Sequence, residues 1–327
     1  MNNSHVKVKP NANIQILSNS NIHNILTPEY IEYRRRWMEN PTNFIVEDFP
    51  IHLDIESTNL CNLKCTFCDK TPYLNSGDFG LMPLELFTKI IDEGSDKKLS
   101  SLKLSYRGEP LIHPKLVDMV CYAKKKGVLD VYFNTNAMLL NERKIQELID
   151  AGLDRVSVSI EGVDKELFER ERIGAKFDTI KNNLACLINM REHNQVKYPR
   201  IRIQTVDLPG INHDQYASYW SSYSDETAVI DYKEAKHRCY TLIDNSWACP
   251  QLWQRMTIEW NGVIMPCNND DYRFLSPGNV KDISVSECWV SPIVQRARSL
   301  HMEGKSHDLK SCNGCPWRTT QIMKIRA

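Results

Sequence analysis

Three cysteines form the first group in this chain whose types and spacing could do chemistry. Cys61, Cys65 and Cys68 stand as C-x3-C-x2-C in the segment CNLKCTFC, directly after a strand-like run. A loop that leaves the carboxyl end of a parallel strand is where such folds normally carry their chemistry. At this cysteine frequency the pattern should arise by chance only about 0.01 times in a sequence of this length. The spacing therefore indicates a metal or cluster site.

The ligand chemistry of this triplet favours iron and sulfide over zinc. Three thiolates can hold three irons of a 4Fe–4S cluster and leave the fourth iron open to a substrate or cofactor. Zinc would need a fourth nearby ligand, and neither Lys64 nor Asp69 is a natural one. We therefore interpret the triplet as an open iron–sulfur site rather than a zinc site or a group of buried free thiols.

Four further cysteines, from two segments near the end of the chain, form a second candidate site. Cys249 and Cys267 flank an Asn-Gly pair between β-rich runs, which is a strong hairpin signal, and Cys312 and Cys315 follow as C-x2-C. Four soft ligands close a site. From ligand chemistry alone, both a structural zinc ion and a fully ligated cluster suited to electron transfer remain open.

The elements that must position these cysteines alternate between strand-like and helical runs from about residue 51. This rhythm predicts an α/β fold, a partial (β/α)6 TIM-like barrel followed by a small C-terminal domain with a β-hairpin and a helix over residues 284–302. The expected strands are residues 52–56, 102–106, 131–135, 155–160, 200–206 and 227–232, and the expected helices are residues 84–97, 114–126, 141–151, 178–194 and 212–223.

The predicted organisation has three parts. Residues 1–50 form a polar, partly helical lead-in, residues 51–238 the barrel, and residues 239–327 the small C-terminal domain. The basic run from Tyr33 to Trp37 in the lead-in is interpreted as a solvated helix face rather than a nucleic-acid patch.

Composition narrows the function classes. The 327 residues carry 41 basic and 41 acidic side chains, so nothing draws the whole molecule to nucleic acid or to an anionic membrane. No stretch approaches the roughly 20 apolar residues of a membrane span, and the first residues lack the apolar core of a signal peptide. We expect a cytoplasmic protein, in which 11 cysteines indicate metal or redox chemistry rather than disulfides.

The segment CNLKCTFC resembles the signature of the radical S-adenosylmethionine (SAM) superfamily, and the resemblance extends over about residues 51–327. It implies that SAM binds the open iron through its amino and carboxylate groups. Reduction of the cluster, by a flavodoxin- or ferredoxin-type donor, then cleaves SAM to methionine and a 5′-deoxyadenosyl radical that abstracts a substrate hydrogen. The role of the protein is to position the reactants and exclude water.

The resemblance also assigns residues around SAM. Residues 106–110, YRGEP, are similar to the family's GGEP motif, in which Gly108 lets the backbone approach the ligand and Glu109 binds the methionine ammonium. Arg107 departs from the usual glycine, which would reshape this loop. The other positions that match family contacts to the adenine, the ribose or the methionine carboxylate are Phe67, Asn136, Ser159, Glu161 and Arg172.

The C-terminal string C-x12-G-x4-C with a later C-x2-C resembles the SPASM/twitch extension, which binds auxiliary 4Fe–4S clusters. The full SPASM pattern has further cysteines after the C-x2-C, and the sequence continues for only twelve residues after Cys315. The resemblance therefore implies the twitch version, with one auxiliary cluster ligated by Cys249, Cys267, Cys312 and Cys315.

Four cysteines lie outside both sets. Cys239, in KHRCY, has cationic neighbours that favour a reactive thiol, and it is a candidate hydrogen donor to a substrate radical, as in the epimerases of this family. Cys121, Cys186 and Cys288 are interpreted as small buried hydrophobes.

Three reactions remain open: oxidation of a hydroxyl-bearing carbon, as in the dehydrogenases of aminoglycoside synthesis, epimerisation of a sugar or peptide, and peptide maturation by cross-linking or formylglycine formation. No peptide-recognition domain is evident before residue 50, which favours a sugar-like small molecule. The alternative from another class is a scaffold with two zinc sites. Four residues in barrel loops are possible substrate contacts, although their spacing matches no motif: Asp207, Asn212, His213 and Glu234. Three histidines are interpreted as structural: His52, His113 and His237.

Overall fold

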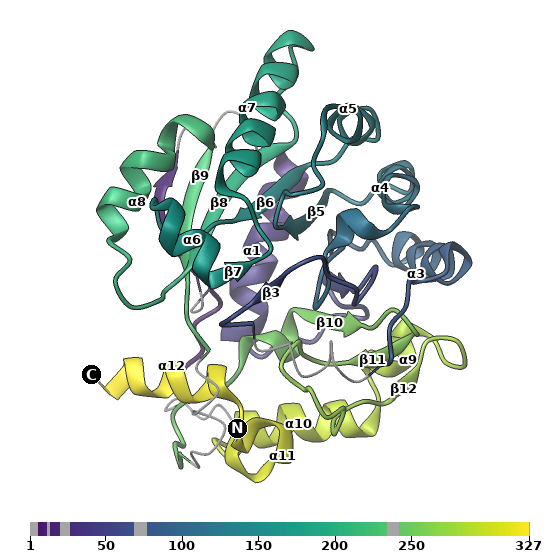
Figure 1. Cartoon of the computed structure of the whole chain (residues 1–327). Coiled ribbons are helices and arrows are strands. Elements are labelled where there is room, and N and C mark those ends of the chain that lie inside the picture. Colours follow the sequence, from purple (N-terminus) through teal and green to yellow (C-terminus); the bar gives the residue numbers. More distant parts are fainter. Residues whose placement is uncertain (1–5, 12–13, 20–26, 69–76, 234–241, 327) are drawn as a thin grey trace.

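One large curved sheet dominates the computed structural model, which describes residues 6–11, 14–19, 27–68, 77–233 and 242–326 (Figure 1). Its ten strands lie in the order β1-β9-β8-β6-β5-β4-β2-β10-β11-β12, and β3 and β7 form a separate two-stranded sheet. The strands are β1 (Ile14–Asn19), β2 (His52–Ile55), β3 (Lys64–Cys65), β4 (Ser101–Lys103), β5 (Asp130–Thr135), β6 (Arg155–Ser159), β7 (Arg172–Ile173), β8 (Arg200–Val206), β9 (Glu226–Ile230), β10 (Arg255–Ile258), β11 (Val263–Met265) and β12 (Gly278–Asn279).

The six predicted strands are confirmed as β2, β4, β5, β6, β8 and β9, all paired in parallel. Within the described residues the sheet ends at β1 and β12 without closing, so the predicted partial barrel is also confirmed. The helices are α1 (Pro28–Thr42), α3 (Leu84–Asp96), α4 (Leu116–Lys125), α5 (Glu142–Asp150), α6 (Lys165–Glu171), α7 (Phe177–His193), α8 (His213–Trp220), α9 (Val285–Trp289), α10 (Pro292–Met302), α11 (Lys310–Asn313) and α12 (Pro316–Arg326).

The two faces of the sheet differ in polarity because side chains alternate along a strand. Apolar side chains such as Leu53, Val131 and Val156 are fully buried or nearly so on the convex side, which α3, α4, α5, α7 and α8 cover (Figure 1). The intervening residues face the concave side. One row of cross-strand neighbours on that side runs from β2 to β8 and consists of Asp54, Lys103, Tyr132, Arg155 and Arg200.

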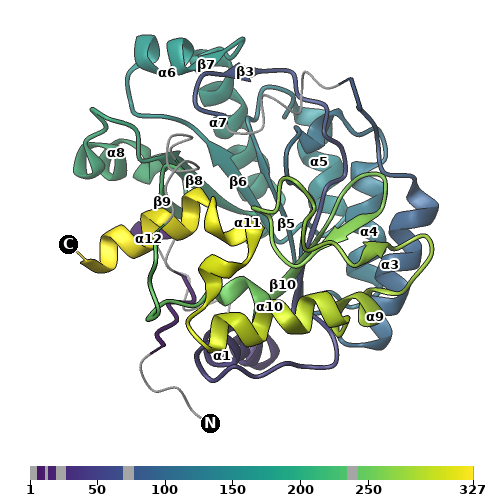
Figure 2. The ribbon, with the colours of Figure 1, turned by 90° about the horizontal axis from the view of Figure 1, so that it is seen from below.

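The N-terminal segment, which the sequence predicted to be only partly helical, contributes both a strand of the main sheet and a helix. Strand β1 pairs antiparallel with β9. Helix α1, which Thr27 caps through its side-chain oxygen, lies at the end of the sheet opposite β3 and β7 (Figure 2). Tyr33 and Trp37 are buried, so the interpretation of this run as a solvated helix face is wrong for its aromatic ends. Arg35 alone of the three arginines is exposed. The aromatic face of α1 closes one end of the concave space.

The C-terminal part continues the main sheet. Strand β10 pairs in parallel with β2, and the predicted hairpin joins β10 to β11 at Asn261-Gly262. Gly262 has a φ of +93°, and a Cβ there would lie 2.4 Å from Asn279 Oδ1. The predicted division of the chain into three parts stays a prediction.

The helix predicted over residues 284–302 is wrong in one respect, because it is two helices, α9 and α10. Pro292 begins α10 and disfavours a helical conformation at the preceding Ser291. Glu93 of α3 accepts hydrogen bonds from the backbone N–H groups of Val285 and Ser286, at 2.9 and 2.8 Å, and so caps α9 from the barrel. Seen from below, α10, α11 and α12 lie together across one side of the molecule (Figure 2). Among the described residues, no helix combines the length and apolar character of a membrane span.

His52 lies fully buried at the start of this polar interior and predicts a pH dependence of stability. Its Nδ1 is 3.0 Å from Ser101 Oγ and its Nε2 is 3.3 Å from Asp54 Oδ1. Burial lowers the pKa of His52 from 6.5 to about 4, although the hydrogen bond with Asp54 opposes the shift. The folded chain therefore holds His52 neutral at a pH where the unfolded chain protonates it. The resulting stability is present above pH 6.5 and is lost as the pH falls through 4.

We expect His52→Gln to remove part of this acid sensitivity. Between pH 6.5 and 4, its free energy of unfolding should fall by up to about 3 kcal/mol less than that of the parent chain. Urea unfolding at several pH values measures the difference. His193→Gln, at the exposed end of α7, should follow the parent profile. Parallel profiles for His52→Gln and the parent would contradict the assignment.

Candidate active site

The cysteine loop of residues 61–68 follows β2 and is fixed to later segments of the chain. The backbone N–H of Glu109 donates to the carbonyl oxygen of Leu60 at 2.7 Å, and the side-chain amide of Asn136 donates to Asn62 Oδ1 at 2.8 Å. Both anchors come from loops at the carboxyl ends of neighbouring strands. The loop thus has a defined position before any cofactor binds.

A third anchor is the small sheet of β3 and β7, which lies beside the main sheet (Figure 1). Cys65 is paired with Arg172 in this sheet, and the next residue, Thr66, donates its backbone N–H to the carbonyl oxygen of Glu171 at 2.9 Å. This pairing was not predicted from the sequence, because each strand has only two residues. It places the Arg172 side chain beside the cysteines.

The three cysteines line one cavity of about 760 Å³ on the concave side of the sheet, together with Phe67. Each is half-buried. Burial raises the pKa of Cys61 and of Cys65, and the neighbouring Cys68 adds to both shifts. Burial raises the pKa of Cys65 to about 11, although Arg172 opposes the shift. Three neighbouring thiols that face an open space fit a cluster with one iron left free for a further ligand.

Glu109 is fully enclosed at the edge of this cavity. Its carboxylate accepts hydrogen bonds from the Thr135 hydroxyl at 2.7 Å, from the N–H of Leu111 at 3.1 Å and from the N–H of Asn136 at 2.8 Å. Burial raises its pKa, and the bond from Asn136 opposes the shift. Since a carboxylate can accept about four hydrogen bonds, capacity remains for an ammonium group.

The need for glycine at position 108 has a different origin from the one expected. A Cβ on Gly108 would lie 2.4 Å from the carbonyl oxygen of Thr58 and 2.5 Å from that of Leu60. The glycine therefore allows the loop after β4 to pack against the backbone that leads into the cysteine loop. Gly108 also lines the cavity, so its approach to a ligand stays a prediction.

Arg172 and Glu161 form a buried pair. The Arg172 guanidinium donates from Nη2 to Glu161 Oε1 at 2.9 Å and from Nε to Glu161 Oε2, and its Nη1 lies 3.8 Å from Cys65 Sγ. Its centre is 5.3 Å from the centre of the Phe67 ring. Glu161 lies behind Arg172 and outside the cavity lining, so it orients Arg172, and its direct contact with a cofactor stays a prediction.

Six of the seven predicted SAM contacts are therefore brought to one cavity. The side chain of Asn136 is already engaged, because its amide donates to Asn62 and its Oδ1 accepts the N–H of Met138 at 3.0 Å. The Ser159 hydroxyl accepts from Gln204 at 3.5 Å. The six that line the cavity are Phe67, Gly108, Glu109, Asn136, Ser159 and Arg172.

Arg107, which departs from the family motif, joins the barrel to the C-terminal hairpin. Its guanidinium donates twice to the Glu56 carboxylate, each at 2.7 Å, and lies 3.0 Å from Glu259 Oε1. Both carboxylates are buried. The adjacent Tyr106 hydroxyl donates to the carbonyl oxygen of Asn268 at 3.1 Å. The loop keeps Glu109 in place and also contacts the segment that follows Cys267.

The four C-terminal cysteines come together from three segments. The pKa of Cys312 is raised well above its ordinary value by burial and by Cys267, Cys315 and Cys249. His301 lies beside them, where its Nδ1 accepts the N–H of Cys249 at 3.1 Å. Four neighbouring thiols offer one ligand to each iron of a 4Fe–4S cluster, and the same number of soft ligands also suits structural zinc.

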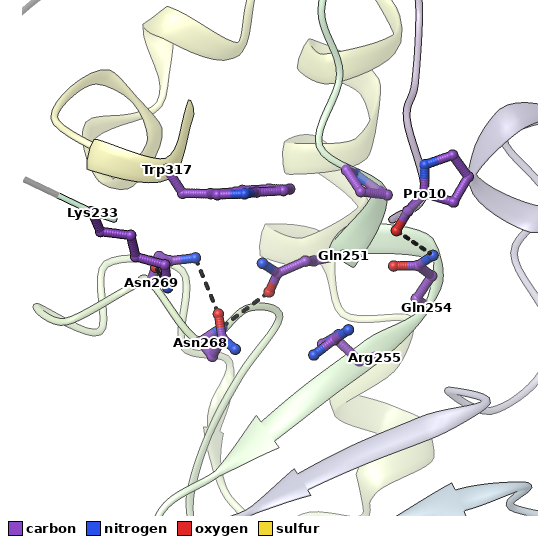
Figure 3. Close-up of a pocket in the computed structure, with 9 residues that line it drawn as sticks. Pro10, Lys233, Gln251, Gln254, Arg255, Asn268, Asn269 and Trp317 are labelled. Carbon is purple, nitrogen blue, oxygen red and sulfur yellow. Dashed lines mark hydrogen bonds between the residues drawn. The ribbon is translucent and has the colours of Figure 1, made fainter. Parts of the chain in front are cut away.

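The C-terminal cysteines adjoin the same large cavity. Asn268, the residue after Cys267, lines it, and so do Lys233 and Arg255. These three residues also line a second cavity of about 20 Å³, under the ring of Trp317 and beside Gln251 (Figure 3). The backbone next to Cys267 therefore reaches the cavity that Cys61, Cys65 and Cys68 line.

Several other residues singled out from the sequence do not line this cavity. Asp207 and His213 contact one another at 2.9 Å, and Asn212 caps α8 by accepting the N–H of Gln215, and none of these three lines the cavity. His52 and His113 are buried with backbone or side-chain partners, as interpreted. Cys288 is buried, and Cys121 and Cys186 are partly buried against the core. Three residues lie outside the described part of the chain: Cys239, Glu234 and His237.

Sequence reasoning missed the charged wall of the cavity. Lys103, Tyr132, Arg155 and Arg202 all line it. Their signal was present, because runs such as RIRIQTV alternate charged and apolar residues, and in a barrel one of these two sets must face inward. Alternation alone does not say which set does so.

Two family models match this chain. Residues 55–218, half of the chain, match the Radical SAM superfamily, and residues 249–316 match SPASM, an iron–sulfur cluster-binding domain. These domains imply a SAM-binding 4Fe–4S cluster and auxiliary iron–sulfur binding. The predicted resemblance is confirmed, while the number of auxiliary clusters stays a prediction.

Similar curated proteins differ in function. The chain is 25% identical to a tungsten-containing aldehyde ferredoxin oxidoreductase cofactor-modifying protein of Pyrococcus furiosus, over 82% of this chain and 87% of that protein. It is 33% identical to a probable GTP 3′,8-cyclase of Methanococcus maripaludis over 41% of this chain, and that match spans 44% of the cyclase.

Similar solved structures share the fold. BtrN in complex with AdoMet and 2-DOIA has a TM-score of 0.56 at 16% identity, covering 81% of this chain and 92% of that one. Native anSMEcpe with AdoMet and the Cp18Cys peptide has a TM-score of 0.59 at 13% identity, covering 84% and 95%. SuiB of Streptococcus suis with its precursor peptide SuiA has a TM-score of 0.52 at 16% identity, covering 86% and 74%.

The Arg107 pairs predict a large loss of stability when this side chain is removed. Arg107→Met leaves Glu56 buried without a cation and leaves Glu259 with Arg273 alone, so we expect the free energy of unfolding to fall by about 3–5 kcal/mol in urea titrations. Arg143→Met, which removes the exposed pair with Glu147, should cost less than about 1 kcal/mol. Equal losses in the two variants would contradict the role of Arg107.

Iron content separates the two cysteine sites. After anaerobic reconstitution with iron and sulfide, the parent chain should hold about eight irons, and a variant with Cys61, Cys65 and Cys68 all changed to alanine about four. The variant Cys312→Ala/Cys315→Ala should also hold about four, whereas Cys288→Ala should match the parent. About twelve irons in the parent would show a second auxiliary cluster. Zinc without sulfide would contradict both sites.

Proposed function

Because this chain belongs to the radical SAM superfamily and carries a SPASM domain, we propose that it oxidises a sugar-like small molecule held in the cavity of about 760 Å³. A 4Fe–4S cluster held by Cys61, Cys65 and Cys68, with SAM, supplies the 5′-deoxyadenosyl radical when bound. Glu109 binds the methionine ammonium and Arg172 brings a positive charge beside the cysteines.

The proposed reaction converts a hydroxyl-bearing carbon to a carbonyl. The carbon loses a hydrogen atom, which ends in 5′-deoxyadenosine, and the hydroxyl then loses a proton as one electron leaves the substrate. That electron balances the one used to cleave SAM, so the net change is SAM and alcohol to methionine, 5′-deoxyadenosine, carbonyl compound and a proton. SAM is the oxidant consumed.

One observation carries this proposal: Asn268, adjacent to Cys267, lines the same cavity as Cys61, Cys65 and Cys68. An electron leaving the substrate therefore has an acceptor site next to the space it occupies. That site offers four thiolates and no open position, which suits electron transfer rather than substrate ligation.

The size of the cavity supports a small substrate. Its volume of about 760 Å³ falls in the range of small-molecule sites, roughly 300–1,000 Å³, and SAM would take part of it. Tyr33 and Trp37 of α1 close one end. BtrN is solved with 2-DOIA and the other two similar structures with peptides, but likenesses of 13–16% identity show the fold alone.

The proposal includes a cytoplasmic location and a flavodoxin- or ferredoxin-type electron donor. The ten described cysteines are all free of disulfides, which supports a reducing compartment. Epimerisation through Cys239 is the competing reaction, and hydrogen tracking separates it from oxidation.

The test is turnover of the reconstituted enzyme in deuterated water, with SAM, a reductant and a panel of sugars. A substrate is recognised by 5′-deoxyadenosine release above the uncoupled rate. We expect one carbonyl product per 5′-deoxyadenosine and no solvent deuterium in the product. Cys312→Ala should still release 5′-deoxyadenosine but lose the product, and Cys288→Ala should retain both. Deuterium at an inverted carbon, lost with Cys239→Ala, would establish epimerisation instead.

A further inference from the structure

Six cationic side chains gather on the part of the cavity wall that is remote from the cysteine loop. Arg155 is the first residue of β6 and Ser159 is the last. Arg155 therefore lies four residues, or about 13 Å, from the carboxyl end of this strand. We call this group the inner basic cluster, and its members are Arg34, Lys103, Arg155, Arg200, Arg202 and Arg255.

Three carboxylates pair with members of the inner basic cluster. Asp54 is shared, since it lies 2.6 Å from Lys103 Nζ and 3.0 Å from Arg255 Nη1. Asp130 lies 3.5 Å from Arg155 Nη2, and Glu226 accepts a hydrogen bond from Arg202 Nε. Asp231, a further carboxylate that lines the cavity, pairs with Lys324 at 2.5 Å.

The remaining cations contact aromatic rings. The Arg34 guanidinium lies 5.3 Å from the centre of the Trp37 ring and 5.6 Å from that of Tyr33, and Arg200 lies 5.9 Å from that of Tyr30. Neither has a carboxylate partner within the described residues. Six cations against Asp54, Asp130 and Glu226 leave an excess of three positive charges on this wall.

An ion-pair network that served only to fill a barrel would be neutral, because an unpaired buried charge is costly. Two features of the inner basic cluster reflect this cost. Burial and repulsion from the neighbouring Arg155 lower the pKa of Arg202, although Glu226 opposes the shift, whereas Asp130 keeps the pKa of Arg155 raised. The enclosed Nε atoms of Arg155 and Arg255 have no hydrogen-bond acceptor in the described chain. A bound anion would relieve this repulsion.

We propose that the inner basic cluster binds an oxyanion of the substrate, a phosphate or carboxylate group, and that the enzyme therefore acts on an anionic small molecule. Guanidinium groups bind both oxyanions through paired N–H donors. Tyr132, whose ring lies 3.9 Å from the Arg155 guanidinium, and Trp37 provide flat apolar surfaces beside the charge. The inference rests on the proposed function, since it names the class of the substrate bound in that cavity.

The test is calorimetric titration of the reconstituted enzyme, with SAM present, using inorganic phosphate, pyrophosphate and acetate as separate probes. We expect at least one probe to bind at one site, and Arg202→Gln and Arg200→Gln each to weaken it by about tenfold or more. Arg200→Gln matters because it leaves no carboxylate without its cation. Arg202→Lys should bind at an intermediate strength, since it keeps the charge and loses the paired donors.

The matched control is Arg191→Gln. Arg191 pairs twice with Asp225 outside the cavity, and its side chain is 16% exposed, as is that of Arg202. It should bind the probes like the parent chain. Binding of no probe, or equal weakening in Arg191→Gln and Arg202→Gln, would overturn the proposal.

The three probes separate the two sources of the oxyanion. Tighter binding of phosphate or pyrophosphate than of acetate points to a phosphorylated substrate, and the reverse to a carboxylic acid. The titration does not require turnover. If the enzyme binds these anions but yields no oxidised product, the proposed function fails alone; if product forms from neutral sugars without anion binding, this inference fails alone.

Discussion

The buried contact of Arg107 with Glu56 and Glu259 is the constraint on which the arrangement of the two cysteine sites depends. Glu56 directly follows β2, Arg107 belongs to the loop that carries Glu109, and Glu259 follows β10 of the C-terminal hairpin. Two carboxylates so well removed from water require cationic partners. Arg107 has enough N–H donors to contact both, and Arg273 adds a second ion pair to Glu259 at 2.6 Å. The loop, the barrel and the hairpin are thereby fixed to one another.

A second constraint follows from the parallel sheet. Parallel sheets are usually apolar on both faces, and a concave wall of arginine, lysine and aspartate departs from that rule. Ion pairs such as that of Lys103 with Asp54 reduce the cost of burying these charges, and rings such as Tyr132 cover them. The N-terminal helix completes the enclosure with Tyr33 and Trp37. The chain thus retains a polar interior space where most barrels have a packed core.

The sequence was sufficient for the strands, for most helices and for the clustering of the cysteines, because alternation, amphipathic spacing and cysteine spacing are local signals. The sequence did not predict contacts between residues that are far apart along the chain. Strand β1 pairs with residues more than 200 positions away, the β3–β7 sheet has two residues per strand, and Arg107 finds Glu259 only after folding. The break at Pro292 was a local signal that the helix prediction passed over.

The distribution of charge along the cavity fixes the direction in which an anionic substrate would lie. With a cluster bound, the thiolates of Cys61, Cys65 and Cys68 would form a negative end, which Arg172 would only partly offset. The inner basic cluster forms a positive end, in which Arg155 lies about 13 Å along β6 from its carboxyl end. An oxyanion would be attracted to the inner end and repelled from the cysteine end. The opposite, uncharged part of the molecule would then lie toward SAM, which places a carbon–hydrogen bond, rather than the charged group, next to the site of radical formation.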